Sequence, residues 1–251
     1  MDKLLKNLII PLIITLVVII LFITLCTLLL KNKSEKAKLW PIRIVFFVLV
    51  ALEIAKIFYL IGRDDYFFPN RFPIVFCSMI MYAYPIFCFK ENRFSDVAKG
   101  FSVIPSILAF IMFAAIQWKY NMSIMQVHSF IYHGSMLAVA IYLLTSKLYK
   151  FEFKKFYGQF LAVGGYLLIA STISLLIGGP ISVFAPGDPY LAFLYDVSGF
   201  SVGICIMIVA VFVAYFAVYG IIELCSRALK KKREKKSNSN KNDLKKVQNV
   251  W

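Results

Sequence analysis

The chain has 251 residues, of which 61% are hydrophobic and 16% aromatic, and its formal net charge is +15. Its mean hydropathy of +0.77 is well above that of soluble globular proteins, so the composition excludes an ordinary soluble domain. A segment within lipid must satisfy its own backbone hydrogen bonds, and no stretch shows the alternating pattern of a transmembrane barrel. The sequence therefore predicts an all-α fold, a polytopic bundle of transmembrane helices.

Apolar segments long enough to span a membrane recur along the chain, separated by short charged stretches. A hydrocarbon core about 30 Å thick needs about 20 apolar residues in a helix. The first segment is too long for a secretory signal peptide and lacks a small-residue cleavage pattern, so we interpret it as a mature helix. The sequence predicts seven spans, at residues 8–30, 41–60, 72–89, 101–117, 128–144, 160–177 and 201–224.

Lysine and arginine residues concentrate on one side of the predicted bundle. The stretches KNKSEKAK, KENRFSDVAK and SKLYKFEFKK all fall on that side, together with the carboxyl-terminal tail. Cytoplasmic loops of membrane proteins carry such an excess of cations. We therefore predict a multi-pass protein of the cell membrane with its amino terminus outside and its carboxyl terminus in the cytoplasm.

The sequence divides into a transmembrane bundle, residues 1–225, and a polybasic tail, residues 226–251. The tail contains RALKKKREKKSNSNKNDLKK and is predicted to be a disordered, solvated cytoplasmic segment. The alternative is attraction to anionic lipid headgroups, worth about 1 kcal/mol per cation near the surface. Nucleic acid is not expected as a partner, and the sequence leaves the oligomeric state open.

The second span carries two ionisable residues in the segment LEIAKIFYL. A charge at the centre of a membrane helix costs about 2.5 to 3.5 kcal/mol, so such residues often mark functional sites. Glu53 and Lys56 are three positions apart and can form an ion pair on one helix face. The structural alternative is a Lys56 side chain that extends to the outer boundary, with Glu53 neutralising it or protonated.

The third span, RFPIVFCSMIMYAYPIFCFK, contains two cysteines at helical spacing. Cys77, Met81, Tyr84 and Cys88 are predicted to form one stripe along this helix. Pro85 should kink its lower half, which would either open a cavity beside Cys77 or reflect ordinary packing. Cysteines in membrane helices are usually inert, and the sequence lacks Cys-x-x-Cys pairs and zinc-ligand spacing. We therefore predict neither a disulfide framework nor a metal site.

The two histidines of the chain lie in HSFIYHG at the start of the fifth span. Five residues rotate a helix by about 500°, which leaves His128 and His133 about 140° apart and disfavours a shared metal. We interpret His128 as an interfacial residue at the helix start and His133 as a buried residue. No metal or cofactor is expected.

Polar residues of three different spans share one predicted depth. Cys77 and His133 each lie about 8 Å below the outer entrance of a span, and Glu53 and Lys56 occur in the same outer half. If the three helices are neighbours, these side chains meet in one layer. One interpretation is a transport or solute-binding protein in which Glu53, Lys56 and His133 line a polar cavity. Another is a structural protein whose polar residues hold helices together.

Two segments resemble a known family of integral membrane proteins. RFPIVFCSMIMYAYPI, followed in the fifth span by HSFIYHGSMLAVAIYLL, resembles the family that includes bacterial YwaF and eukaryotic transmembrane protein 164. The resemblance covers residues 53–144 and includes the acidic Glu53. Phe72 stands where members have leucine before Pro73, and Phe76 stands where some members have a polar residue before Cys77.

The resemblance implies an activity on membrane lipids. The eukaryotic relative is regarded as an acyltransferase that moves fatty acyl chains between phospholipids, so phospholipid and lysophospholipid are the implied substrates. It implies Cys77 as nucleophile and His133 as base of a phospholipid acyltransferase or lipid acyl hydrolase, in the outer-leaflet half of the bundle. The oxyanion would be stabilised by one of Lys56, Ser78, Tyr84 and Tyr132. The other residues predicted to support the site or line its pocket are Glu53, Met81 and His128.

Overall fold

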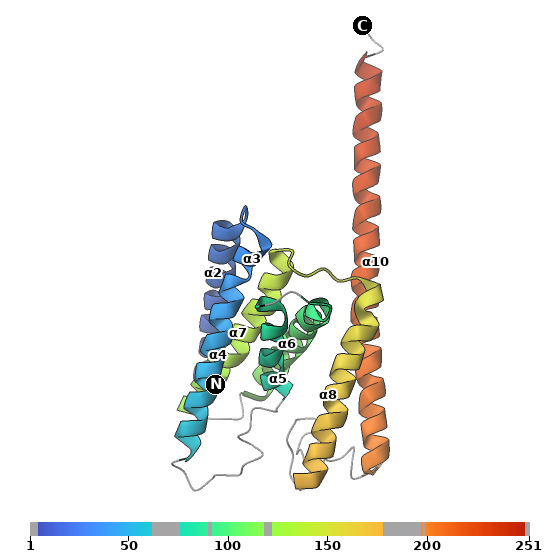
Figure 1. Ribbon diagram of the computed structural model, residues 1–251. Helices are drawn as coiled ribbons and strands as arrows, with labels where there is room; N and C mark the ends of the chain where they lie inside the picture. The colour runs from blue at the N-terminus through green and yellow to red at the C-terminus, as the bar shows by residue number, and fades with distance from the viewer. Residues whose placement is uncertain are drawn as a thin grey trace.

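The computed structural model describes residues 5–61, 76–89, 92–117, 122–177, 197 and 199–248 of the chain. All regular structure in these ranges is helical, which confirms the predicted all-α class (Figure 1). In chain order the elements are η1 (Leu5–Ile9), α2 (Ile10–Leu30), α3 (Glu35–Lys38), α4 (Trp40–Ile61), α5 (Phe76–Cys88), α6 (Ser95–Gln117), α7 (Ile124–Thr145), η3 (Phe153–Lys155), α8 (Phe156–Ile177) and α10 (Phe200–Gln248).

Six helices of the described part are long and apolar enough to cross a membrane, so the chain is a multi-pass membrane protein. The helix of the third predicted span, α5, is shorter, with its apolar part at Cys77–Cys88. Residues 72–75 of that predicted span lie outside the described residues. Figure 1 places α3 and the connection between α7 and α8 at the end of the bundle beyond which α10 extends, as the predicted orientation requires. The orientation itself stays a prediction.

Helix α7 lies at the centre of the bundle and contacts α2, α4, α5 and α6. Small buried residues on α7, among them Gly134, Ala138 and Ala140, allow these close contacts. A Cβ atom on Gly134 would lie 2.6 Å from Thr15 Cγ2 of α2, so this crossing requires a glycine. Within α2 itself only Ile19 is fully buried, which leaves most of the apolar surface of this helix for lipid.

The carboxyl-terminal end of α5 is capped by an arginine of α4. The Arg43 guanidinium donates hydrogen bonds of 2.8 Å and 2.6 Å to the Cys88 carbonyl, where α5 ends. The same guanidinium lies over the rings of Trp40 and Phe89, at 5.4 Å and 5.5 Å from their centroids. A helix end has carbonyls without intrahelical partners, so Arg43 both satisfies one of them and joins α4 to α5.

Helices α8 and α10 form a pair beside the bundle (Figure 1). Aromatic side chains interlock between them: Phe156 and Phe160 of α8 pack edge-on against Phe212 of α10, with ring centroids 5.1 Å apart in both cases. The pair joins the bundle where α8 contacts α6. A Cβ atom on Gly100 of α6 would lie 2.2 Å from Gln159 Nε2, so a glycine is required where these two helices cross.

The carboxyl-terminal segment differs from its predicted disorder. Helix α10 continues without a break from Phe200 to Gln248, through most of the predicted tail. Its sequence favours helix in the first part of this stretch, because RALKKKREKK consists of strong helix formers, and no Gly or Pro follows Gly220. The division of the chain into a bundle and a separate tail stays a prediction.

Candidate functional site

The ion pair expected in the second span is present in α4. Lys56 Nζ lies 2.5 Å from Glu53 Oε2, and the two side chains are only 12% and 6% exposed. A lone charge at this depth would be costly, so each residue neutralises the other. The three-residue spacing that indicated this pair in the sequence places both side chains on one face of α4.

Helix α5 brings Ser78 and Cys77 to this ion pair. The Ser78 hydroxyl donates a hydrogen bond of 3.5 Å to Glu53 Oε1, and Ser78 is fully buried. Cys77 is partly buried and lies close enough to Lys56 and Glu53 to interact with them electrostatically. Consecutive residues are about 100° apart around a helix, so Ser78 meets α4 directly while Cys77 stays beside the contact.

Helix α7 adds a histidine and a tyrosine. His128 Nε2 donates a hydrogen bond of 3.2 Å to the carbonyl of Leu52, the residue before Glu53. A carbonyl can only accept, so Nε2 carries the proton and Nδ1 is bare in the neutral ring. The imidazole stacks on Tyr132 with centroids 5.7 Å apart, and the Tyr132 hydroxyl donates to Met81 Sδ of α5 at 3.9 Å. We name this set the outer polar cluster: Glu53, Lys56, Cys77, Ser78, Met81, His128 and Tyr132.

His128 lies in the second turn of α7, which begins at Ile124 rather than at the predicted residue 128, and the interpretation of this residue as interfacial stays a prediction. Helix α7 begins at Ile124 because Ser123 caps it: the Ser123 hydroxyl accepts a hydrogen bond of 3.4 Å from the Gln126 amide. The side chains of Ser123 and Gln126 also contact each other, as in a capping box. The additional turn carries His128 into the bundle, where it faces α4.

His133 makes its contacts with α6 and with its own helix. Its ring is parallel to that of Phe113, with centroids 4.6 Å apart, and Nδ1 donates a hydrogen bond of 2.9 Å to the Ser129 carbonyl. Nε2 is therefore the bare nitrogen of the neutral ring. Among the described residues, no hydrogen bond joins His133 to Cys77. Tyr132, the residue before His133 on α7, has its ring edge-on to that of His133, with centroids 5.9 Å apart. It is Tyr132, and not His133, that contacts α5, through Met81.

The lower part of the α5 stripe belongs to the core. Met81, Tyr84 and Cys88 are at most 2% exposed. Tyr84 packs edge-on against Phe87, with centroids 6.0 Å apart, about two turns below Cys77. The lower part of the stripe is therefore buried, with Met81 in the outer polar cluster and Tyr84 below it.

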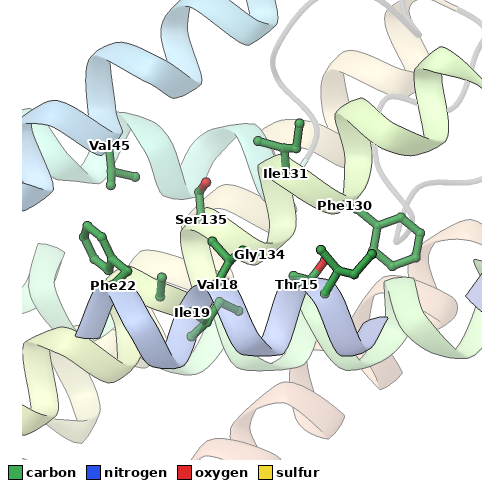
Figure 2. A pocket seen from close by; sticks show the side chains of 11 residues that line it. Thr15, Val18, Ile19, Phe22, Val45, Phe130, Ile131, Gly134 and Ser135 are labelled. Carbon is green, nitrogen blue, oxygen red and sulfur yellow. The ribbon is translucent and has the colours of Figure 1, made fainter. Parts of the chain in front are cut away.

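An apolar cavity of about 230 Å³ lies between α2, α4 and α7. Thr15 and Ser135 supply the polar side chains of its lining, and Figure 2 shows Thr15 and Val18 of α2 beside Gly134 of α7. Phe130 and Gly134, which also line the cavity, are neighbours of His133 on α7. The cavity therefore borders the α7 segment that carries His133, although His133 is not part of its lining.

A second polar cluster, at the end of the bundle that is predicted to be cytoplasmic, joins α6, α8 and α10. The hydroxyls of Tyr149 and Tyr219 are 2.7 Å apart, and Gln159 Nε2 donates a hydrogen bond of 3.2 Å to the Asp96 carbonyl. Lys155 Nζ lies 3.0 Å from Asp96 Oδ2. Burial raises the pKa of Tyr149, which keeps its hydroxyl neutral. These residues were not predicted from the sequence, although Gln159, a polar residue directly before the sixth predicted span, is a signal that would have indicated them.

These features define a class: a multi-pass helical membrane protein with charged residues buried in one half of its bundle. Among the described residues, no three His, Cys, Asp or Glu side chains are grouped so that they could hold a metal ion, and all five cysteines are unpaired.

The family follows from a comparison over most of the chain. Residues 4–219 match the model of the TMEM164 family, so the chain belongs to this family. This match confirms the resemblance seen in two spans and extends it over most of the bundle. No curated protein and no solved structure shows significant similarity to the chain.

Proposed function

We propose that this protein is a phospholipid acyltransferase of the cell membrane, with Cys77 as nucleophile and His133 as base. The observation that carries the proposal is the position of Cys77, a partly exposed thiol beside a buried Glu53–Lys56 ion pair within a membrane bundle. A thiolate is the nucleophilic form of cysteine, and a nearby cation favours it. Lys56 supplies that cation, and its pairing with Glu53 offsets part of its charge.

The proposed reaction has two balanced steps. The Cys77 sulfur attacks the ester carbonyl of a phospholipid and forms a thioester, while its proton passes to His133 Nε2 and then to the departing lysophospholipid oxygen. In the second step a lysophospholipid hydroxyl gives its proton to Nε2 and attacks the thioester, which releases Cys77. Water in place of the lysophospholipid would give hydrolysis.

The hydrogen bonding of His133 suits this role. With Nδ1 bonded to the Ser129 carbonyl, the neutral ring presents Nε2 as the proton acceptor. Cys77 and His133 must approach each other when the lipid enters, and catalytic hydrogen bonds are commonly loose before substrate binds. The apolar cavity that borders this segment of α7 provides space for the acyl chain during this step.

Two groups of the outer polar cluster could stabilise the oxyanion in this proposal. Lys56 and Ser78 both lie at the ion pair beside Cys77, and each is engaged with Glu53 in the structure. Donors held in place before the reaction stabilise a developing oxyanion most effectively. Glu53 therefore holds both donors in position.

The proposal is tested with purified protein in nanodiscs that contain a phospholipid with a labelled acyl chain and an unlabelled lysophospholipid. Transfer of label is expected with the native protein and with Cys205→Ser, a matched control at an exposed cysteine of α10. Cys77→Ser and His133→Ala are expected to abolish transfer, and hydroxylamine should release labelled acyl chains from native protein quenched during turnover. Transfer that survives both substitutions would refute the mechanism.

A further inference from the structure

A larger cavity, of about 430 Å³, lies between α5, α6 and α8 and is not part of the outer polar cluster. Its walls are apolar and extend from Met79 of α5 to Phe94, directly before α6. Ala162, Gly165 and Ile169 of α8 form the third side. We name this cavity the α5–α8 groove.

The α5–α8 groove is separate from the proposed reaction site. Met79 and Ile86, which line it, are about 180° to 200° around α5 from Cys77. A molecule in this groove therefore lies on the side of α5 that faces away from the thiol. The groove also lies nearer the predicted cytoplasmic end of the helices, because Phe94 directly precedes α6 and Val97 lies in its first turn.

Gly165 leaves space in the wall of the groove. A Cβ atom built on Gly165 meets nothing within 4 Å, so no neighbouring residue of the chain requires a glycine there. Glycine in a helix interior costs about 1 kcal/mol relative to alanine. The empty space on this side of α8 is thus available to a molecule other than the protein.

A cation stands at the predicted cytoplasmic mouth of the groove. The Arg93 guanidinium lies over the ring of Phe94 at 4.7 Å from its centroid, and Phe94 is both a groove residue and 55% exposed. The nearest carboxylate on α6, Asp96, is paired with Lys155 at 3.0 Å. In the described part of the chain no salt bridge offsets the charge of Arg93.

We propose that the α5–α8 groove binds one acyl chain of an anionic phospholipid of the cytoplasmic leaflet, with the lipid phosphate at Arg93. Lipid tails are as apolar as the groove, so burial alone gives no preference for this place over the bilayer. Retention comes instead from the concave fit on three helices and from the attraction of an anionic headgroup to a cation near the surface.

The test uses full-length protein reconstituted in nanodiscs with equal amounts of phosphatidylglycerol and phosphatidylcholine. Lipids that remain bound on release from the disc are counted by native mass spectrometry. The native protein is expected to retain phosphatidylglycerol about fivefold more than phosphatidylcholine. Arg93→Gln should lower this preference for phosphatidylglycerol, and Gly165→Leu should lower the retention of both lipids because the new side chain fills the groove.

Gly164→Leu is the matched control. It adds the same side chain to the same helix, at a position where a Cβ atom also meets nothing within 4 Å but which does not line the groove. Retention equal to that of the native protein is expected. Native-like retention by Gly165→Leu, equal losses in Gly164→Leu, or equal retention of the two lipids by the native protein would overturn the proposal.

A second measurement does not depend on these variants folding. A phosphatidylglycerol with a diazirine in the middle of one acyl chain is activated in nanodiscs that contain the native protein, and adducts are mapped by peptide mass spectrometry. Adducts concentrated on the groove residues of α5 and α8 are expected, and adducts spread evenly over α2 as well would overturn the assignment. Cys77→Ser should give the native adduct pattern, because the groove does not depend on acyl transfer.

Discussion

Gly100→Ala tests how tightly α8 is fastened to the bundle. The added Cβ atom would lie 2.2 Å from Gln159 Nε2, 2.4 Å from Gln159 Cδ and 2.6 Å from the Tyr149 hydroxyl oxygen. Carbon atoms in contact are normally separated by about 3.5 to 4.0 Å, so Gln159 would have to move by more than 1 Å. Gln159 is fully buried and has no open space into which to swing.

The expected loss of stability follows from the contacts that this movement breaks. The hydrogen bond from Gln159 to the Asp96 carbonyl contributes about 1 kcal/mol, and overpacking costs about 1 to 3 kcal/mol. Alanine regains about 1 kcal/mol as the better helix former. The free energy of unfolding should therefore fall by about 1 to 3 kcal/mol.

The assay is reversible unfolding in mixed micelles with increasing dodecyl sulfate, followed by circular dichroism. Gly220→Ala is the control, because a Cβ atom there meets nothing within 4 Å and the substitution should stabilise α10 by up to about 1 kcal/mol. The double variant Gly100→Ala/Gln159→Ala removes the clash with Gln159 and leaves the contact with the Tyr149 hydroxyl. It should be more stable than the sum of the two single changes predicts, by about 1 kcal/mol. A Gly100→Ala protein as stable as the native one, or single effects that simply add, would refute this reasoning.

Three further substitutions have defined outcomes. Arg43→Ala removes two hydrogen bonds from a charged donor to the end of α5, and the same unfolding assay should show a loss of about 1.5 to 3 kcal/mol. Gly134→Ala forces α2 and α7 apart at Thr15 and should cost about 1 to 3 kcal/mol, most of which Thr15→Ser restores by removing the methyl group in the way. Lys154→Ala should raise the pKa of Glu152 towards its ordinary 4.5 in an NMR titration, because a hydrogen bond and the charge of Lys154 hold it lower. The ion pair of Glu152 is accordingly present above pH 4.5 and lost as the pH falls below that value.

The membrane helices were largely predictable, because about 20 consecutive apolar residues have few other uses. The first residue of each helix was less predictable. Helix α6 begins at Ser95, before the predicted residue 101, since its first turns, SDVAKG, are helical without being apolar. Helix α7 likewise starts early because of the Ser123 cap, which depends on one hydrogen bond rather than on hydropathy.

The depth of the candidate site in the bundle was also predictable, but the direction in which each of its side chains points around its helix was not. Rise per residue placed Glu53, Cys77 and the α7 residues in one layer, and the contacts among α4, α5 and α7 bear this out. Which α7 side chain meets α5 depends on a rotation of about 100° per residue. Tyr132 contacts α5 and His133 contacts α6 because the two residues are one position apart and so point about 100° apart. The packing of the helices sets the rotation of α7, and the positions of the spans in the sequence do not determine it.

The attachment of α8 and α10 has a consequence for how the protein unfolds. Helix α10 packs against α8 and η3, and α8 meets the bundle at α6. The contact between this pair and the bundle is therefore smaller than the contact between α7 and the other helices of the bundle. Segments with few shared contacts open as separate cooperative units, at lower free energy than global unfolding. Native-state hydrogen exchange should therefore resolve two units, and Gln159, at their boundary, sets how independently the second one opens.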